Sequence, residues 1–185
     1  MKTGMTKVVP PLLKWTGSKR RLAQQIIRYI PGHRRYYEPF LGSGAVLYCL
    51  ARPGCVAGDI YAPLVEFWRL VQQNPQILID DYRRQWHELQ SDFPAYYYAV
   101  RQRFNASPNA LDLSFLTRTC VNGIIRFNAA GEFNNSLHLS RRGMLPERFA
   151  KLVAAWHQRL QGVNILCGDY AETVATAEKR DFVYC

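Results

Sequence analysis

Residues 36–44 read YYEPFLGSG, and this stretch decides how the chain folds. Its first three residues predict a short strand, its glycines predict a loop, and the apolar residues 45–50 that follow predict a helix. Glycine suits such a loop because a side chain would keep a ligand away from the backbone. The stretch therefore predicts a strand, a ligand-holding turn and a helix in succession.

An acidic residue follows the next predicted strand. Residues 55–58 form that strand after a turn at 53–54, and Asp59 comes directly after it. A carboxylate in this place can accept hydrogen bonds from both hydroxyls of an adenosine ribose. The loop holds a single GxG and not GxGxxG, which leaves no clear cradle for a pyrophosphate, and turn glycines without a ligand are the alternative. Together with Asp59, the loop favours a nucleoside-type cofactor.

Helices and short strands alternate at both ends of the chain. Ser18 is expected to cap a helix whose apolar residues recur at helical spacing up to Ile30. Further strands are expected at 163–167 and 182–185, with an amphipathic segment at 170–178 between them. This alternation predicts an α/β fold, in which a parallel sheet has helices on both faces.

The stretch between the second and third strands is much longer than the dozen or so residues that a crossover needs. We therefore interpret residues 62–158 as an inserted, mostly helical subdomain, and residues 1–61 and 159–185 as the core that carries the sheet. Within the insert, helices are expected near 62–72, 76–91, 94–105, 109–121 and 146–160, and a hairpin near 124–140.

The chain of 185 residues is strongly basic, with 24 Lys and Arg against 14 Asp and Glu and a formal net charge of +10. Basic residues raise the affinity for nucleic acids by releasing the counterions condensed on phosphates. A nucleic-acid partner is therefore expected, and a solvated basic face is the alternative. No acid precedes Glu38, whereas nine bases do: Lys2, Lys7, Lys14, Lys19, Arg20, Arg21, Arg28, Arg34 and Arg35.

Other features argue against several classes of protein. No apolar run approaches the roughly 18 residues of a membrane-spanning helix, and residues 1–15 lack the pattern of a secretory signal. The five cysteines form no CxxC pair and the four histidines form no HxH or HxxxH pair. Neither a disulfide framework nor a metal site is expected, and the chain is expected in the cytoplasm, away from any membrane.

Residues 14–19, KWTGSK, stand immediately before the first predicted helix. Trp15 offers a face that can cover a cofactor. Lys19 can pair with a carboxylate such as that of a methionine moiety, helped by the helix N-terminus. An aromatic anchor beside an exposed lysine is the alternative.

Seven segments together resemble the Dam-type DNA adenine N6-methyltransferase family. The resemblance implies a Rossmann-like class I fold that binds S-adenosyl-L-methionine, with a helical target-recognition insert between the second and third strands. It also implies methyl transfer to an adenine flipped out of double-stranded DNA. The segments, in the family's order, are KWTGSK (14–19), EPFLGSGAV (38–46), GDIYAPLVEFW (58–68), YYYAVRQRFN (96–105), LTRTCVNGIIRFNAAGEFN (116–134), ILCGDYAE (165–172) and DFVYC (181–185).

The resemblance implies a set of cofactor contacts. Asp59 is placed on the ribose, and Asp169 with Tyr170 beside the adenine, where a carboxylate can accept the amino hydrogens and a ring can cover the base. A helix cap is the alternative for Asp169. The full set is Trp15, Lys19, Glu38, Phe40, Gly42, Gly44, Asp59, Asp169 and Tyr170.

The resemblance also implies a base-reading hairpin. Arginine and asparagine make bidentate contacts with the edges of guanine and adenine, and further arginines hold phosphates. A polar hairpin with ordinary turn asparagines is the alternative. The expected DNA contacts are Arg118, Asn122, Arg126, Asn128, Asn134, Arg141 and Arg142.

Two departures from the family concern catalysis and specificity. The family carries Asp-Pro-Pro-Tyr directly after the strand at 181–185, and this tetrapeptide is not among the residues of this chain. We therefore assign no catalytic residue and expect an incomplete sheet and no activity from the chain by itself. Residues 135–138 read NSLH where GATC-methylating members carry Pro-Phe-Gly, and Val121 replaces an aromatic of many relatives. Methylation of GATC is therefore not supported.

Two other functions are alternatives for this sequence. A non-catalytic DNA-binding remnant of such an enzyme would bind DNA without binding the cofactor. A nicotinamide-dependent oxidoreductase is disfavoured because the chain lacks GxGxxG.

Overall fold

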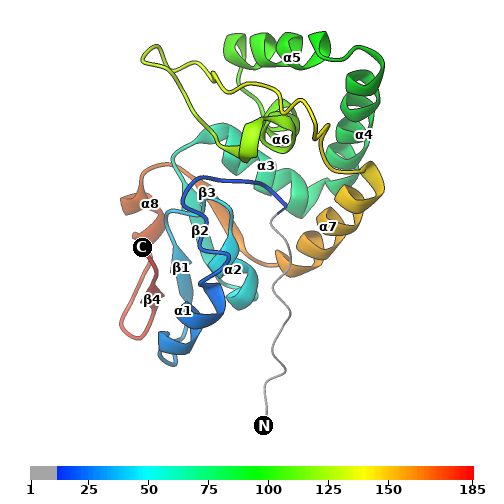
Figure 1. Ribbon diagram of the computed structural model, residues 1–185. Coiled ribbons are helices and arrows are strands. Elements are labelled where there is room, and N and C mark those ends of the chain that lie inside the picture. The colour runs from blue at the N-terminus through cyan, green and yellow to red at the C-terminus, as the bar shows by residue number, and fades with distance from the viewer. Residues whose placement is uncertain (1–11) are drawn as a thin grey trace.

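Four short parallel strands form the sheet in residues 12–185, the part of the chain that this computed structural model describes (Figure 1). The sheet and its flanking helices confirm the predicted α/β, Rossmann-like class. Lys2 and Lys7, counted among the N-terminal bases, lie outside the described residues. The strands are β1 (Tyr36–Glu38), β2 (Val56–Asp59), β3 (Asn164–Cys167) and β4 (Phe182–Val183), in the order β3-β2-β1-β4.

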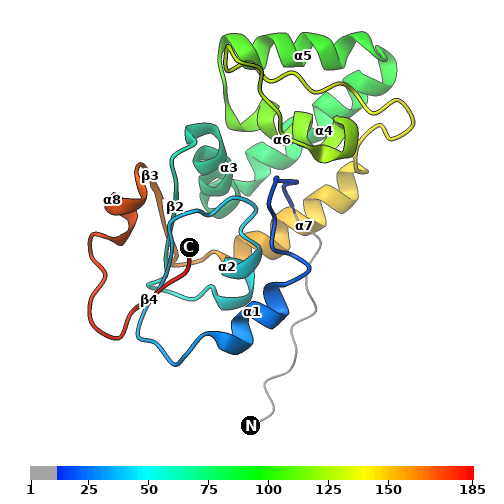
Figure 2. The ribbon, with the colours of Figure 1, turned by 60° about the vertical axis from the view of Figure 1, so that its left-hand side comes forward.

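Helices cover both faces of this sheet. On one side α1 (Ala23–Tyr29) and α2 (Ala45–Leu50) pack against each other, and on the other side α8 (Tyr170–Val174) contacts β1 and β2 (Figure 2). Strands with two covered faces carry continuous runs of buried residues, and β1 is buried over its whole length. Because Glu38 pairs with Ala57 in the parallel ladder, β1 and β2 end side by side.

The chain between β2 and β3 forms the expected run of helices. In Figure 1, α4, α5 and α6 lie away from the sheet, whereas α3 lies against β2 and β3. The division of the chain at residues 61 and 159 stays a prediction. The helices are α3 (Ala62–Gln73), α4 (Pro75–Ser91), α5 (Ala95–Ala106), α6 (Ala110–Thr119) and α7 (Pro146–Arg159).

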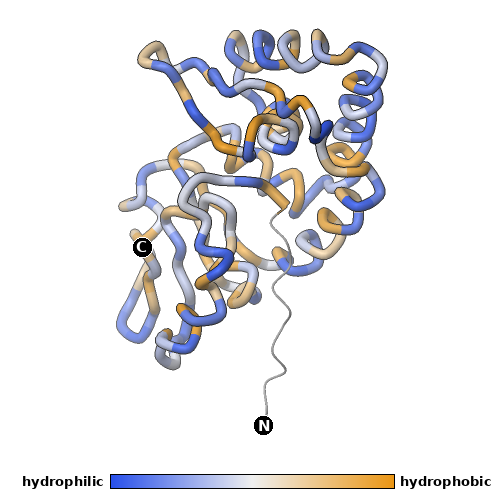
Figure 3. Tube along the Cα trace, in the orientation of Figure 1, coloured by the Kyte–Doolittle hydropathy of each residue, from blue (hydrophilic) through white to orange (hydrophobic). Residues whose placement is uncertain are grey.

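The packing of the insert follows from the pattern of its helices. Hydrophilic and hydrophobic residues alternate along α4 and α5 (Figure 3). In α4 the buried residues Leu78, Tyr82 and Leu89 recur at helical spacing. Such a face is stabilised by the other helices of the insert, and α4 contacts α5, α6 and α7.

The segment between α6 and α7 follows the course of a hairpin without forming regular strands. A short 3-10 helix, η1 (Val121–Gly123), follows α6. Isolated antiparallel bridges then pair Cys120 with Leu137 and Phe127 with Phe133. The expected hairpin is therefore present as two bridged arms.

The expected start of the first helix is wrong. No side chain caps α1, which begins at Ala23, five residues after Ser18. The backbone turns at Gly17 with a φ of +78°, and the hydroxyl of Ser18 instead accepts a hydrogen bond from the hydroxyl of Ser43 at 2.7 Å. Leu22, expected on the apolar face, is half exposed. A tertiary contact to the glycine loop thus takes the place of the local cap.

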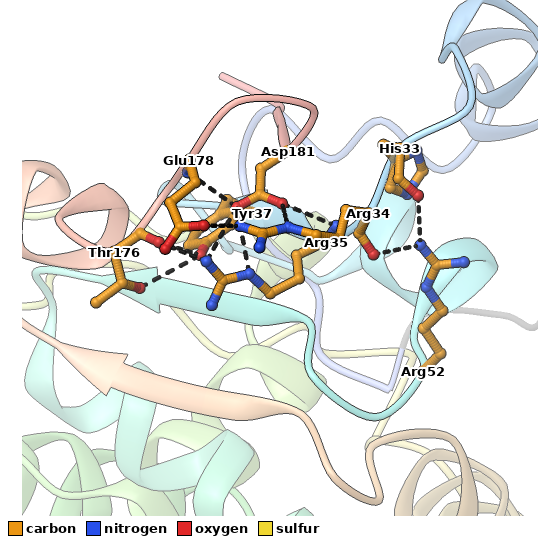
Figure 4. Close-up of polar contacts among 8 residues, drawn as sticks. All are labelled: His33, Arg34, Arg35, Tyr37, Arg52, Thr176, Glu178 and Asp181. Carbon is orange, nitrogen blue, oxygen red and sulfur yellow. Dashed lines mark hydrogen bonds and ion pairs between the residues drawn. The ribbon is translucent and has the colours of Figure 1, made fainter.

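A cluster of ion pairs ties the start of β4 to the start of β1 (Figure 4). Asp181, whose side chain is 1% exposed, accepts hydrogen bonds from Nε of Arg34 at 3.0 Å and from the N–H of Arg35 at 3.1 Å. Arg34 also pairs with Glu178 at 2.6 Å. The N–H of Phe182 donates to the carbonyl of Arg35 at 2.9 Å, which continues the contact along the backbone. These bonds hold β4 beside β1.

Within residues 12–185, no helix has the length and apolar character needed to cross a bilayer. The same residues contain no cluster of His, Cys, Asp and Glu that could hold a metal ion.

Candidate functional site

A cavity of about 390 Å³ opens where β1 and β2 end, beside the glycine loop. Its volume lies within the ~300–1,000 Å³ that is typical of small-molecule sites. Six of the predicted cofactor residues line it: Trp15, Lys19, Glu38, Phe40, Gly42 and Asp59. The remaining lining residues are Thr16, Gly17, Ser18, Leu41, Ser43, Ala45, Val46, Tyr184 and Cys185.

Asp59 is fixed against the glycine loop. Its Oδ2 accepts a hydrogen bond from the N–H of Gly42 at 3.1 Å, and its Oδ1 accepts one from the N–H of Tyr61 at 3.1 Å. Each carboxylate oxygen has a second lone pair. The side chain is thus held in the cavity wall with capacity to accept further hydrogen bonds, as a ribose diol would require.

The two glycines of the loop serve different contacts. Gly42 has a φ of +48°, and a Cβ there would lie 3.0 Å from Cδ1 of Trp15, so glycine permits the indole to pack on the loop. Gly44 has a φ of +64°, and a Cβ there would lie 3.1 Å from Cη2 of Trp156. Gly44 therefore faces the hydrophobic core, and it is not among the residues that line the cavity.

Glu38 places a buried carboxyl group in the cavity wall. The residue is 3% exposed and accepts a hydrogen bond from the hydroxyl of Tyr36 at 2.7 Å. Burial raises the pKa of Glu38 to about 8, against the opposing effect of hydrogen bonds from Tyr36 and from the backbone of Leu47. Glu38 forms no ion pair within residues 12–185. A cationic group bound in the cavity would supply the missing counter-charge.

The predicted adenine-side residues lie at the rim and not in the lining. Tyr170 is 55% exposed and stacks on Phe40, with ring centroids 5.9 Å apart and an interplanar angle of 28°. Asp169 caps α8, because its Oδ1 accepts a hydrogen bond from the N–H of Ala171 at 2.8 Å. Asp169 therefore acts as a helix cap in this structure. Tyr170 is linked to the cavity by its stacking on Phe40, which lines it.

A second cavity of about 660 Å³ adjoins the first. It lies between residues 14–22 and residues 122–124 of the insert, and it shares Trp15, Thr16 and Ser18 with the first cavity. Its lining contains the bases Lys14, Arg20 and Arg21, together with Leu22, Asn122, Gly123 and Ile124. The electrostatic character of this groove is therefore basic.

The pKa of Lys14 reflects the presence of other cations near this groove. Its pKa is lowered mainly by burial, and further by the nearby positive charges of Arg118 and Arg141. Neighbouring positive charges that repel one another favour the arrival of negative charge. The groove therefore suits a phosphate-bearing ligand.

The predicted DNA-contact residues of the hairpin are mostly exposed. Asn122 lines the basic groove, in a left-handed conformation with a φ of 55°. Arg126 is exposed, and its Nε donates to Oδ1 of Asn134 at 2.9 Å. Arg141 and Arg142 are also exposed, and the guanidinium of Arg142 lies 4.0 Å from the ring centroid of Phe93.

Asn128 behaves as a turn residue at the tip of the hairpin. Its Oδ1 accepts hydrogen bonds from the N–H groups of Ala130 at 3.0 Å and Glu132 at 2.9 Å, and its Nδ2 donates to the carboxylate of Glu132 at 2.9 Å. The turn alternative therefore describes Asn128 in this structure.

Arg118, predicted from the sequence to contact DNA, is buried in this structure. The residue is 8% exposed, and its Nε donates to the backbone carbonyl of Leu12 at 2.8 Å. Burial lowers the pKa of the guanidinium to about 10. Every residue of α6 from Leu113 to Thr119 is buried, so this helix holds its arginine inside the fold. We therefore leave Arg118 out of the candidate DNA-binding surface.

Sequence reasoning missed several residues that the fold brings to these cavities. Lys14, Arg20 and Arg21 lie within or next to the KWTGSK motif, so their sequence position was a usable signal. Tyr184 lines the first cavity only because β4 pairs with β1, which no local pattern reveals.

Comparison with known proteins gives a consistent set of relatives. "DNA adenine methylase" of Vibrio cholerae is 31% identical over 177 residues, which cover 94% of this chain and 62% of that protein. "DNA N-6-adenine-methyltransferase" of Escherichia phage P1 is 31% identical over 179 residues, covering 94% of this chain and 23% of that protein. "Type II methyltransferase M.MjaIII" of Methanocaldococcus jannaschii is 31% identical over 198 residues, covering 95% of this chain and 68% of that protein.

The match also extends over almost the whole described structure. The chain spans about 62% of the length of the Vibrio cholerae relative. Residues 15–185 match a family that is described as D12 class N6 adenine-specific DNA methyltransferase. Since the matched range covers nearly the whole chain, including the glycine loop, the chain belongs to the D12 class family of N6 adenine-specific DNA methyltransferases.

Proposed function

We propose that this chain supplies the cofactor and DNA contacts of an enzyme that methylates the N6 amino group of adenine at specific sites in double-stranded DNA, with S-adenosyl-L-methionine as the methyl donor. The observation that carries the proposal is the position of Asp59, whose carboxylate is bonded to Gly42 in the wall of a cavity that adjoins a basic groove. A nucleoside site next to a phosphate-binding surface is what a DNA methyltransferase needs.

The lining of the first cavity suits the three parts of the cofactor. Asp59 would accept hydrogen bonds from the ribose hydroxyls. Lys19, in the segment that precedes α1, would pair with the methionine carboxylate, and Glu38 would face the positive charge of the methionine ammonium. The exposed rings of Phe40 and Tyr170 would cover the adenine at the rim. Asp169, with one oxygen used in the cap, would accept a hydrogen bond from the adenine amino group through the other.

The second cavity and the hairpin suit duplex DNA. Lys14, Arg20 and Arg21 would hold phosphates at the groove. The side chain of Asn128 is engaged in the turn, so only its exposed edge would be available to DNA. The residues proposed as base or phosphate contacts are Asn122, Arg126, Asn128, Asn134, Arg141 and Arg142. Trp15 belongs to both cavities, so a base flipped out of the duplex would approach the cofactor past this ring.

The chemistry requires help at the adenine nitrogen, because its lone pair is delocalised into the ring. When bound, S-adenosylmethionine supplies an electrophilic methyl group on a sulfonium. In the family a carboxylate and a backbone carbonyl of Asp-Pro-Pro-Tyr accept the two amino hydrogens. This tetrapeptide is not among residues 1–185, so we give no residue of this chain a catalytic role. We infer a cytoplasmic location from the DNA substrate.

Calorimetric titration with S-adenosylhomocysteine tests the cofactor site without requiring turnover. The chain is expected to bind this ligand and not NAD. Substitution of Asp59 by Ala or Asn is expected to weaken binding by about ten- to a hundredfold, because hydrogen bonds to a charged group contribute ~1.5–3 kcal/mol.

The matched control is Asp80→Ala, which removes an exposed carboxylate on α4. It is expected to leave the affinity unchanged. Binding of DNA without any binding of S-adenosylhomocysteine would contradict the proposal and favour the non-catalytic DNA-binding remnant.

A further inference from the structure

The side chain of Arg118, which belongs to the insert, contacts the segment that precedes the cofactor cavity. It belongs to α6, and Nε and Nη2 of its guanidinium both donate to the carbonyl of Leu12, the former at 2.8 Å. Leu12 and Leu13 are fully buried. Because the guanidinium is planar and rigid, two of its N–H groups donating to one carbonyl oxygen fix both the position and the direction of that peptide group.

The segment held in this way is the wall between the two cavities. Trp15, Thr16 and Ser18 line both. Figures 1 and 2 show this part of the chain, drawn in dark blue, running along the boundary between the sheet and the insert.

The wall is fixed from the sheet side as well. The ring of Trp15 packs on the glycine loop at Gly42 and lies 5.9 Å from the ring of Tyr61. Ser18 accepts a hydrogen bond from Ser43 at 2.7 Å.

On the insert side, Gly123 approaches Lys14 so closely that a Cβ at this position would overlap the lysine side chain. Its φ of +65° also favours glycine. Gly123 follows Asn122, which lines the basic groove. Displacement of the wall would therefore alter both cavities.

We propose that Arg118 is a positioning residue of the cofactor site, which holds residues 12–18 so that Trp15 closes the cavity beside the glycine loop. This inference rests on the proposed function, since it takes the first cavity as the cofactor site. It assigns the arginine a role inside the enzyme, in contrast to the phosphate or base contact that the sequence predicts. The same contact links the DNA-reading insert to the cofactor wall.

Two variants separate positioning from DNA contact. Arg118→Lys keeps the charge but not the planar fork, and Arg118→Met removes both. With S-adenosylhomocysteine and no DNA, we expect Arg118→Lys to weaken binding severalfold and Arg118→Met by roughly tenfold or more, as for the loss of a charge-assisted hydrogen bond. A direct DNA contact would leave both affinities unchanged.

The salt dependence of duplex binding gives an independent readout. Removal of one phosphate contact reduces the magnitude of the negative slope of log K against log salt concentration by about 0.9. We expect no change of this slope for Arg118→Met, and a less steep slope for Arg142→Met, which replaces an exposed arginine on the proposed DNA surface. Arg83→Met, which removes an exposed charge from α4, serves as the control for charge alone.

The link between the two sites can be measured as a coupling. In the native chain, S-adenosylhomocysteine is expected to change the affinity for DNA, and DNA to change the affinity for S-adenosylhomocysteine by the same factor. In Arg118→Lys this factor is expected to be closer to one, which means weaker coupling between the two sites. A loss of general stability would lower the melting temperature without removing the coupling.

Folding of each variant is checked by near-ultraviolet circular dichroism below its melting temperature. If Arg118→Met does not fold, Arg118→Lys and Gly123→Ala still test the wall, and both are expected to weaken S-adenosylhomocysteine binding. Native affinity in a folded Arg118→Lys, or a reduced salt slope with native cofactor affinity, would overturn the inference. Failure of the native chain to bind S-adenosylhomocysteine would instead overturn the proposed function.

Discussion

Glu38 lies at the end of β1, where the sheet, the glycine loop and the cavity meet. Its carboxyl group is buried beside the neutral hydroxyl of Tyr36 and faces no cation of the described chain. Burial without a counter-charge favours the protonated acid, so its pKa rises from 4.5 to about 8. At neutral pH this residue holds a proton that the unfolded chain would release.

This difference predicts that stability falls as the pH rises. Between pH 4.5 and about 8 the folded state binds more protons than the unfolded state through Glu38. Because one pKa unit corresponds to about 1.4 kcal/mol, we expect the free energy of unfolding to decrease by a few kcal/mol across this window relative to Glu38→Gln. Urea unfolding of both proteins at pH 5 and pH 8 measures the effect.

The control is Glu88→Gln, which changes an exposed glutamate of α4 and is expected to keep the native pH dependence. Equal pH dependence in the native chain and in Glu38→Gln would show that Glu38 ionises as freely as in the unfolded chain. It would also remove the argument for a cationic ligand at this wall.

At the scale of elements, β4 depends on contacts made outside its own two residues. Asp181 precedes it and is held by Arg34 and Arg35 (Figure 4). The hydrogen bonds from Arg34, with those from Arg35, keep the pKa of Asp181 well below its usual range. A depressed carboxyl pKa stabilises the fold above the pKa of the unfolded chain, and this contribution is lost as the pH falls.

Asp181→Asn is expected to loosen β4 without unfolding the insert. Amide hydrogen exchange measures this directly, since the N–H of Tyr184 donates to the carbonyl of Tyr37 at 2.8 Å. We expect faster exchange of the amides of Tyr184 and Phe182. The amide of Asn164, in β3 at the opposite edge of the sheet, is expected to exchange at the native rate. Asp80→Asn, which breaks an exposed ion pair with Arg83, should change none of these amides. Unchanged exchange in Asp181→Asn would show that backbone pairing alone holds the strand.

At the scale of the whole molecule, part of the net charge of +10 lies on one surface. Lys14, Arg20 and Arg21 gather at the second cavity, and Arg141 lies close enough to lower the pKa of Lys14. Cations collected on one surface attract a polyanion and release its counterions. Part of the excess charge therefore lies beside the proposed cofactor site.

Duplex binding is expected to be strongly dependent on salt through this groove. The double variant Arg20→Gln with Arg21→Gln should reduce the magnitude of the negative slope of log K against log salt concentration by about 0.9 for each phosphate that the protein no longer neutralises. Fluorescence anisotropy with a labelled duplex provides the measurement. The control is Arg83→Gln with Arg84→Gln, which removes the same charge from α4, where both arginines pair with aspartates. Equal slopes for the two double variants would show that only the total charge matters.

The sequence determined the strands, the glycine loop and most helices of this protein. The periodicity of apolar residues and the placement of turn residues depend on neighbours that are close in the sequence. YYEPFLGSG became β1, a loop and the start of α2, and Asp59 came to lie beside that loop. The position of Asp59 also follows from chain connectivity, since parallel neighbours end at the same edge of a sheet.

Only the tertiary structure decided which polar residues face a cavity and which are buried. Arg118 and Arg126 belong to the same motif, yet the first lies inside the fold against Leu12 and the second is exposed on the hairpin. Ser18 bonds to Ser43 rather than capping a helix. Each of these outcomes depends on a partner far away in the chain, and the free energy of that contact is set only when helices and sheet pack together.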